Sequence, residues 1–371
     1  MMEAKKTIVW ITPDSFYDVD WPIVNRLVEH YDIKWFVLWT RGTSRETPHN
    51  PNIYKFIELP YRGRDPRIIR IYFKLLREIK AIKPAVVYNG YDGDPYLYPM
   101  AFTMMDRNLF IMEGHEPNPY RRRIHTRLVV KCLKWDIDHI GHVQVFSKFT
   151  EREFHQMYPR TECTYIPMVP KDYGNPTKAL DFGGRKVFLF FGGVRPDKRL
   201  DILLKAFVAM GKEFQEKAYL LVYGSCESER VKEFEAIVNN AENIELHFGF
   251  AADSIIPNLF TSSHYLVLPY QVVTQSGPNM IAYHYNLPII ATNLDGFTER
   301  ITHGVDGYIF PVNDEKALKD LLEKCICQTD EEYNMIKMNM AERVAKEYSP
   351  EVVIEKYKAM LNYVIEKNHK K

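Results

Sequence analysis

Short apolar runs alternate with segments of helical period along the whole chain. The pattern opens with an apolar run at 7–12, continues with an amphipathic segment at 20–31, and returns to an apolar run at 33–39. Apolar runs of about four to eight residues indicate buried strands, and apolar positions three or four residues apart indicate helices that cover a sheet. Because strands that alternate with helices favour parallel sheets, we predict an α/β fold.

The pattern breaks once, at 171–186, where Pro, Gly and charged residues replace the periodic positions. We interpret this segment as a linker between an N-terminal domain, 1–170, and a second α/β domain, 187–348. Each domain is expected to be a doubly wound parallel sheet. A final amphipathic helix is predicted over 349–371, with Ser349 as its N-cap. Its apolar stripe consists of Val353, Tyr357, Met360, Leu361 and Val364.

Two earlier helices are also predicted from their patterns. In the segment 20–31, Asp20 is expected as the N-cap and Pro22 in the first turn. A long helix is expected over 66–83. The positions expected on its apolar side are Ile69, Tyr72, Phe73, Leu76 and Ile79.

The first candidate for chemistry is the loop that follows the apolar run at 187–191. Gly192 and Gly193 end this strand, and the next helix is expected to begin near Asp197, so that Arg195 and Lys198 lie in the connecting loop. Glycines let a backbone approach a ligand closely, and fixed cations at a strand-to-helix turn suit a phosphate or diphosphate. The spacing is neither that of a P-loop nor that of a dinucleotide fingerprint. A plain turn with solvated cations therefore remains an alternative.

The second candidate is the stretch "TQSGPN" at 274–279, which stands between two apolar runs. Pro278 is expected to open a short helix that stops at Asn286. A helix N-terminus offers unpaired N–H donors and the positive end of the helix dipole, although these donors could simply face water. Both candidates are expected at the carboxyl edge of one sheet, where ligands bind. Two cations beside a helix start fit a diphosphate, so we predict an anion site there.

Composition narrows the class of protein. The 371 residues are 46% hydrophobic and 26% charged with a net charge of +1, so nothing global favours a nucleic-acid partner. The N-terminal apolar run is too short for a signal peptide, and no window reaches the length of a membrane span. An odd set of cysteines without metal spacing suits a reducing compartment, and we expect a cytoplasmic protein without a metal site. These cysteines are Cys132, Cys163, Cys226, Cys325 and Cys327.

Three segments of the second half carry a family resemblance. They read "FFGGVRPDKRLDILLKAF", "YLLVYGSCESE…IELHFGF" and "YLVLPYQVVTQSGPNMIAYHYNLPIIATNLDGFTERITHGVDGYIFP". In order and spacing they resemble the donor domain of the family 4 retaining glycosyltransferases, which have the GT-B fold. The resemblance implies two Rossmann-like domains that face each other across a cleft, with the C-terminal helix returning to the N-terminal domain.

The resemblance also implies site residues. Arg195 and Lys198 would hold the donor diphosphate, and His115 resembles the family's cleft histidine that contacts the donor sugar. A lone histidine is as often structural, and Glu299 is more simply read as a residue that caps or braces the following helix. The positions implied at the nucleotide-sugar donor are Gly192, Gly193, Gln275, Ser276, Gly277, Pro278, Asn279 and Glu299.

The sequence departs from the usual family pattern at two positions. Family members carry two glutamates eight residues apart, and Val273 and Ile281 occupy those places here. The contacts of those carboxylates with the donor sugar and ribose are thereby in doubt. The "TQSG" form resembles a branch of the family that has small polar residues there.

The resemblance implies a retaining transfer, without metal or resident cofactor, of a sugar from a nucleotide-diphospho-sugar to a glycan or lipid-linked acceptor. Surface polysaccharide biosynthesis would be the setting. Two alternatives stay open. One is a nucleotide-sugar 2-epimerase of the same fold, although such enzymes have carboxylates where Pro278, Asn279 and Met280 stand. The other is an inactive homologue that acts as a binding protein.

Basic residues gather in the N-terminal half. Between Lys55 and Lys134 there are 16 Lys or Arg against 8 Asp or Glu. Two amphipathic segments, 66–83 and 120–135, carry most of them, and each is read most simply as a solvated face. Members of the family with lipid-linked acceptors dock on anionic membranes through such faces, so peripheral contact with the inner face of the cell membrane is the competing reading. The stripes consist of Arg67, Arg70, Lys74, Arg77, Arg123, Arg127, Lys131 and Lys134.

Overall fold

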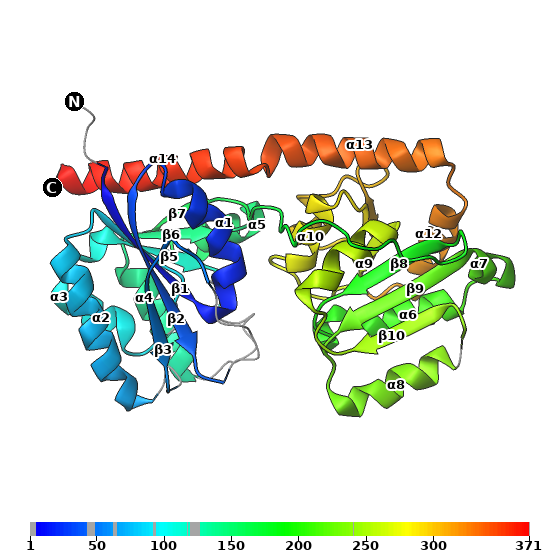
Figure 1. Cartoon of the computed structure of the whole chain (residues 1–371), viewed down its shortest axis with the longest axis horizontal. Helices are drawn as coiled ribbons and strands as arrows, with labels where there is room; N and C mark the ends of the chain where they lie inside the picture. The colour runs from blue at the N-terminus through cyan, green and yellow to red at the C-terminus, as the bar shows by residue number, and fades with distance from the viewer. Residues whose placement is uncertain are drawn as a thin grey trace. The chain divides into compact units, whose positions relative to one another are not determined.

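The structure is a computed structural model that describes residues 5–42, 49–61, 65–91, 94–116, 118, 127–239 and 241–370. The chain divides into two compact units (Figure 1). The first consists of Met1–Val169 together with Pro350–Lys371, and the second of Pro170–Ser349. In the part of the chain that is described, no helix combines the length and the apolar content needed to cross a membrane.

The first unit is built on a seven-stranded parallel sheet, as predicted. Its strand order is β3-β2-β1-β4-β5-β6-β7, so the chain changes direction across the sheet between β1 and β4. The strands are β1 (Thr7–Pro13), β2 (Asp32–Thr40), β3 (Ile53–Leu59), β4 (Val86–Asn89), β5 (Phe110–Gly114), β6 (His142–Val145) and β7 (Glu162–Tyr165).

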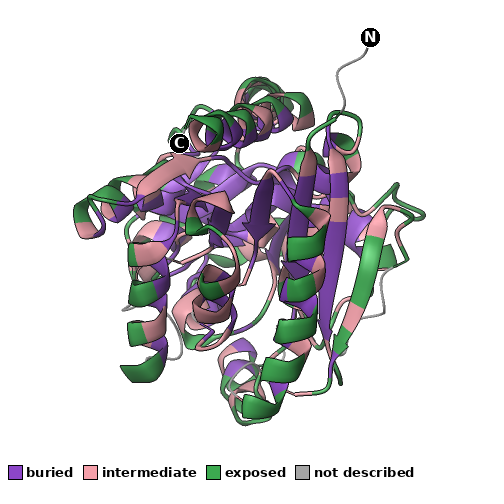
Figure 2. Ribbon diagram, turned by 90° about the vertical axis from the view of Figure 1, so that its left-hand side faces the viewer, coloured by how far each residue is buried: buried purple, intermediate pink, exposed green. Residues whose placement is uncertain are grey.

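Helices cover both faces of this sheet, and their buried residues lie on the sides that pack against it (Figure 2). One apolar core joins the sheet to α2, α3, α4 and α5, whereas the core on the opposite face contains α1 and α14. The helices are α1 (Tyr17–Leu27), α2 (Ile69–Ile82), α3 (Leu97–Met104), α4 (Arg127–His139), α5 (Lys148–Met157) and α14 (Pro350–His369).

The C-terminal helix α14 belongs to the first unit, which confirms the prediction that it returns there. All five residues of its predicted apolar stripe are buried. Tyr357 packs against the rings of Trp10 and Tyr88, with centroids 5.8 and 6.1 Å away. Polar contacts fix the helix further, because Tyr31 donates a hydrogen bond to Asn362 Oδ1 (2.8 Å) and the Lys367 ammonium to Glu162 Oε1 (2.6 Å).

Two expectations for helices of this unit were wrong. Asp20 does not cap α1, because a short 3₁₀ turn at Asp14–Phe16 leads directly into a helix that already begins at Tyr17. The Asp20 side chain is instead fully buried and accepts a hydrogen bond from Thr12 Oγ1. On α2, Ile69 and Phe73 are exposed rather than turned to the core. A 3₁₀ turn at Pro66–Ile68 sets the phase of that helix, and Ile68, Tyr72, Leu75, Leu76 and Ile79 are buried.

The second unit repeats the doubly wound arrangement with six parallel strands in the order β10-β9-β8-β11-β12-β13. The direction of the chain across this sheet therefore changes between β8 and β11. The strands are β8 (Lys186–Phe191), β9 (Ala218–Gly224), β10 (Ile244–Phe248), β11 (Tyr265–Leu268), β12 (Ile289–Thr292) and β13 (Tyr308–Phe310). The helices are α6 (Leu200–Val208), α7 (Lys212–Lys217), α8 (Ser228–Val238), α9 (Ile256–Ser262), α10 (Gly277–His284), α11 (Asp295–Thr298), α12 (Glu315–Ile326) and α13 (Asp330–Glu347).

The segment at 171–186, which we interpreted as the linker, has no helix or strand until β8 begins at Lys186. It lies along the second unit. Tyr173 N donates to the Tyr285 hydroxyl (3.1 Å), and Leu180 N donates to Ser262 Oγ (2.9 Å).

Candidate functional site

The two loops singled out in the sequence follow the two strands at which the second sheet changes direction. Gly192 and Gly193 directly follow β8, and the residues at 274–276 lie between β11 and α10. Ligands of open α/β sheets bind outside the carboxyl ends of such strands. The topology therefore places both predicted anion-binding segments at the position in this sheet where a ligand is expected.

Gly192 brings the first loop against the start of α10. Its φ is +116°, a conformation that favours glycine, and a Cβ added here would lie only 3.3 Å from Pro278 Cγ. The loop also crosses the end of β9, because Gly192 N donates to Tyr223 O (2.9 Å) and a Cβ on Gly224 would overlap the Gly192 carbonyl oxygen. Only glycines allow the loop, β9 and α10 to approach this closely.

Ser276 is the N-cap residue of α10. Its hydroxyl accepts a hydrogen bond from Asn279 N, and Gly277 and Pro278 are the first helical residues. Since Pro278 has no N–H and the Asn279 N–H is engaged by the cap, fewer donors face outward than the sequence suggested. Lys171 adds a cation instead, because its Nζ lies 3.8 Å from the place that a Cβ on Gly277 would occupy.

Lys198 joins the two loops through Tyr270, which stands just beyond β11. The Lys198 ammonium lies 3.6 Å from the centre of the Tyr270 ring, a cation–π contact beneath the loop. Burial raises the pKa of the Tyr270 phenol, and a hydrogen bond with the Ser276 side chain opposes that shift. Lys198 itself is largely buried, and this desolvation together with the charge of Arg195 lowers its pKa to about 7.

Arg195 and Lys198 share one counterion, Asp197. The Arg195 guanidinium donates to both carboxylate oxygens of Asp197, at 3.1 and 2.9 Å, and Lys198 Nζ lies 4.0 Å from the same carboxylate. The backbone of Asp197 is held in turn by Gln271 N, which donates to its carbonyl oxygen (2.8 Å). The Asp197 carboxylate therefore offsets part of the charge of the two cations.

The other predicted donor residues are placed as follows. Gln275 and Gly193 are partly exposed, whereas Asn279 is completely buried in α10. Glu299 is the C-cap of α11, and its carboxylate accepts a hydrogen bond from the neighbouring Arg300 Nε (3.3 Å).

The two positions that lack the usual glutamates are apolar and packed. Ile281 is 3% and Val273 9% exposed, and Val273 lies against the turn at Gly296, where a Cβ would come within 3.1 Å of Val273 Cγ1. This loop therefore provides no carboxylate at either place. Within the described ranges, no group of three His, Cys, Asp or Glu side chains gathers in a way that could hold a metal ion.

His115 lies in the first unit, directly after β5. Its ring stacks in parallel on Phe16, lies at a tilt against Phe146, and its Nε2 is paired with the Glu113 carboxylate. The side chain is 9% exposed. The structure thus gives His115 a fixed ring orientation in the interior of its own unit.

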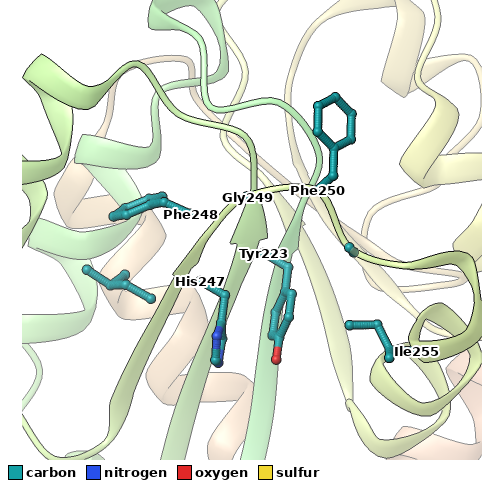
Figure 3. A pocket seen from close by; sticks show the side chains of 8 residues that line it. Tyr223, His247, Phe248, Gly249, Phe250 and Ile255 are labelled. Carbon is teal, nitrogen blue, oxygen red and sulfur yellow. The ribbon is translucent and has the colours of Figure 1, made fainter. Parts of the chain in front are cut away.

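Aromatic residues line a pocket of about 380 Å³ at the carboxyl ends of β9 and β10 (Figure 3). Tyr223 and His247 stack on each other in it, with ring centres 4.2 Å apart, and Phe250 at its rim is 84% exposed. The strands that carry the pocket are bonded to the glycine loop and to each other, because Tyr223 O accepts the Gly192 N–H and Gly249 N donates to Gly224 O (3.1 Å).

Sequence reasoning missed Lys171, Asp197, Tyr270 and this pocket as parts of the site. The alternation of charge in "RPDK" could have indicated Asp197 as a counterion. Tyr270 and Lys171 carry no local signal, because each reaches the site from another part of the chain.

Comparison with known proteins shows what the second unit is similar to. Residues 185–328 match the family described as "Glycosyl transferases group 1". The capsular polysaccharide biosynthesis glycosyltransferase CapM of Staphylococcus aureus is 24% identical over 185 residues, which are 49% of this chain and 47% of CapM. The match thus spans about half the length of that relative.

Solved structures extend the likeness to the whole chain. Sucrose-phosphate synthase from Thermosynechococcus elongatus is 13% identical with a TM-score of 0.77, over 98% of this chain and all of that one. HepE from Anabaena, solved with UDP and glucose, is 14% identical with a TM-score of 0.76 over 96% of this chain and all of its own. The chain therefore has the GT-B fold, and residues 185–328 in its second unit match the glycosyl transferases group 1 family.

Proposed function

We propose that this protein transfers a sugar, with retention of configuration and without a metal ion, from a nucleotide-diphospho-sugar to a glycan or lipid-linked acceptor. One observation carries the proposal. Arg195 and Lys198 gather with the start of α10 at the point where the second sheet changes direction. This is an arrangement suited to a diphosphate. Support for the donor class comes from HepE, which was solved with UDP and with UDP-glucose.

The cations would act on the leaving group. As the bond between the sugar C1 and the diphosphate oxygen breaks, its electron pair stays on that oxygen, and Arg195 and Lys198 stabilise the charge that develops. Two fixed cations supply the positive charge for which other transferases use a metal ion. His115, on the first unit, would contact the donor sugar.

The acceptor would attack from the side on which the diphosphate departs. Val273 and Ile281 leave this loop without a carboxylate nucleophile or base. The acceptor oxygen then bonds to C1 while its proton passes to the departing diphosphate oxygen, so that no group of the protein is consumed. Retention follows, because the new bond forms on the face that the old bond leaves.

The aromatic pocket suits the nucleobase of such a donor. Tyr223 and Phe250 offer ring faces on which a planar base can stack, and base–aromatic stacking contributes about 1–3 kcal/mol. The pocket adjoins the glycine loop, so that base and diphosphate would bind to one unit.

The membrane side of the proposal concerns the first unit. Of the predicted stripes, Arg67 just before α2, three basic residues of α2 and three of α4 are exposed, and both helices cover the same face of the sheet. Among them lie four exposed apolar side chains, namely Ile69, Phe73, Leu128 and Trp135. Arg123, the eighth basic residue of the predicted stripes, lies outside the described residues. Mixed basic and apolar exposure suits an anionic membrane surface, from which a lipid-linked acceptor would be taken.

The test is calorimetric binding of UDP-, GDP- and TDP-sugars. We expect micromolar binding of one donor, and loss of that binding in the double variant Arg195→Ala with Lys198→Ala. The matched control removes two exposed cations elsewhere in the same unit, Lys205→Ala with Lys212→Ala, and should bind normally. If the folded native protein binds none of these donors, the transferase is excluded and an inactive homologue is favoured.

Consumption of the bound donor separates the remaining alternatives. A transferase releases the nucleoside diphosphate only when an acceptor is present and forms a glycoside with the donor's anomeric configuration. A 2-epimerase instead inverts C2 of the sugar without an acceptor. An inactive homologue binds the donor and changes nothing.

A further inference from the structure

Two carboxyl groups are fully buried in the first unit and take no part in the proposed reaction. Asp20 lies on α1 and Glu113 on β5, and each is 0% exposed. Burial of a carboxylate is costly unless it is paired, so the partners of these two groups should explain their presence.

Asp20 is held by a chain of donors. Thr12 Oγ1 donates to Asp20 Oδ2 (2.6 Å), and Trp35 Nε1 donates to Thr12 Oγ1 (2.8 Å). The carboxyl of Asp20 also lies within hydrogen-bonding reach of Glu113. Burial and the Glu113 charge together raise the pKa of Asp20 well above its ordinary value.

Glu113 faces His115 as well as Asp20. Its Oε1 pairs with His115 Nε2. The phenols of Tyr88 and Tyr357 also face the two carboxyls, and they stay neutral because burial and the carboxylate charges raise their pKa. The Tyr88 hydroxyl donates a hydrogen bond to Gln144 Oε1 (2.8 Å).

Two adjacent carboxyl groups in a medium of low polarity do not both ionise, so they hold one proton between them. A protonated carboxyl is a donor, whereas an ionised one only accepts. With the proton on Asp20, Glu113 can accept one hydrogen bond from Asp20 and another from the Nε2–H of His115. The ring of His115 then carries its lone pair on Nδ1.

We propose that Asp20 and Glu113 share one proton and act as a positioning pair for His115, holding its neutral ring as the Nε2–H tautomer with Nδ1 as the hydrogen-bond acceptor. The flat contact with Phe16 keeps the ring in one plane, and the pair selects which nitrogen accepts. An acceptor at Nδ1 suits a sugar hydroxyl as ligand. This last step rests on the proposed function, in which His115 contacts the donor sugar, whereas the pairing and the tautomer do not.

The primary test is nuclear magnetic resonance of the imidazole nitrogens in the unmodified chain, with His115 assigned from its loss in His115→Gln. We expect the Nε2–H tautomer at neutral pH. In Glu113→Gln the carboxylate is gone, so the midpoint of the His115 titration should move to lower pH by about one unit or more. In Asp20→Asn the amide replaces the shared proton as donor to Glu113, so tautomer and midpoint should be kept.

A matched control is Asp94→Asn, which alters another buried carboxyl of this unit that accepts from Tyr72 and from two backbone N–H groups. It should leave the His115 signals unchanged. An Nδ1–H tautomer in the native chain, or an unchanged midpoint in folded Glu113→Gln, overturns the proposal. Should Glu113→Gln not fold, the native tautomer and the Asp20→Asn titration decide the matter without it.

Kinetics then separate this proposal from the proposed function. If Glu113 acts through His115, Glu113→Gln lowers kcat in the native background but not in His115→Gln. Full additivity of the Glu113 and His115 effects contradicts the positioning role. A chain with the expected tautomer but no sugar transfer would refute the proposed function and leave the pair in place. A chain that transfers sugar with the wrong tautomer would do the reverse.

Discussion

At the scale of single residues, Lys198 has a pKa that its surroundings lower, and this shift has consequences for binding and stability. Its ammonium is enclosed between the Tyr270 ring and the loop, and it stands beside another cation, so that its pKa falls to about 7. A lysine whose pKa is close to neutral pH takes up a proton when an anion binds beside it, because the anion raises that pKa. The Asp197 carboxylate alone does not restore the ordinary value.

Donor binding should therefore depend on pH. A diphosphate favours the charged form of Lys198, so binding takes up a proton where the free site is partly neutral. We expect the affinity for a nucleotide-diphospho-sugar to be constant below about pH 6 and to fall by up to about tenfold per unit above pH 7. Calorimetry in buffers of different ionisation enthalpy measures the proton uptake directly. Lys198→Arg, which stays charged, is the control, and a flat pH profile for the native chain would contradict the prediction.

The same residue should limit stability. Since its folded pKa lies below the unfolded one, the folded state loses stability wherever lysine is charged in the unfolded chain. The destabilisation is at its full size below about pH 7, and it disappears as the pH rises towards the pKa of an unperturbed lysine. Lys198→Met should thus stabilise the second unit by about 1–3 kcal/mol at pH 6 and by less at pH 9, while donor binding is lost. Thermal unfolding at both values tests this, and equal gains at the two values would refute the cause.

Residues also show where sequence reasoning stops. Arg195, Lys198 and Ser276 could be found because each stands in a short pattern with a chemical meaning. Tyr270 could not, since its contact with Lys198 exists only once two distant strands are side by side. Asp20 was read as a cap from its position before an amphipathic segment, but a preceding 3₁₀ turn started the helix earlier and turned the side chain inward.

At the scale of elements, the approach of the β8–α6 loop to α10 is set by Gly192. Gly192→Ala should destabilise the second unit by about 1–3 kcal/mol and weaken donor binding, because both the left-handed φ and the contact with Pro278 oppose a side chain. Gly174→Ala is the control, since Gly174 also has a left-handed φ, of +91°, but nothing within 4 Å of an added Cβ. It should lose stability without losing binding. Equal effects on binding would mean that the contact with Pro278 is not what matters.

The basic face of α2 allows a separate test. Lys74→Ala with Arg77→Ala removes two exposed charges, and each basic residue near an anionic surface contributes about 1 kcal/mol, so partition onto phosphatidylglycerol vesicles should fall roughly thirtyfold. Lys205→Ala with Lys212→Ala, in the other unit, should partition like the native chain. Equal binding to phosphatidylcholine vesicles would argue against an electrostatic docking face.

Helical phase explains why this face was only partly predicted. The sequence pattern of α2 allows either Ile69 or Ile68 on the buried side. In the structure Ile68, the last residue of the 3₁₀ turn before the helix, is the buried one. Periodicity therefore located the helix and its basic residues but placed two apolar side chains on the wrong side. Those two, Ile69 and Phe73, are the ones that a membrane could cover.

At the scale of the whole molecule, the alternation of apolar runs and helices predicted the two sheets, and the family resemblance implied the return of α14 to the first unit. Strand order did not follow, because the pattern along a chain does not say which strands are neighbours. The order matters for function, since it is the change of direction between β8 and β11 that brings the two candidate loops to one edge.

Each unit should have its own unfolding transition, and α14 should affect only the first. Tyr357→Ala removes a buried ring from that core and should lower the first unit's stability by about 3–5 kcal/mol, with the transition of the second unit unchanged. Tyr363→Ala changes the same residue type on the same helix where it is 48% exposed, and should cost about 1 kcal/mol or less. Differential scanning calorimetry distinguishes the transitions. A joint shift of both would show that the units unfold as one.

The place of α14 also bears on how the protein is made. Chains are synthesised from the N-terminus, and domains generally fold as their last residues emerge. Here the first unit is begun at β1 but lacks part of its core until Tyr357, Leu361 and Ile365 have left the ribosome. The second unit, although it starts at Pro170, is complete by Ser349. The first unit is therefore translated first but completed last. The sheet face that α14 covers stays exposed while the whole second unit is synthesised, and it must not aggregate during that time.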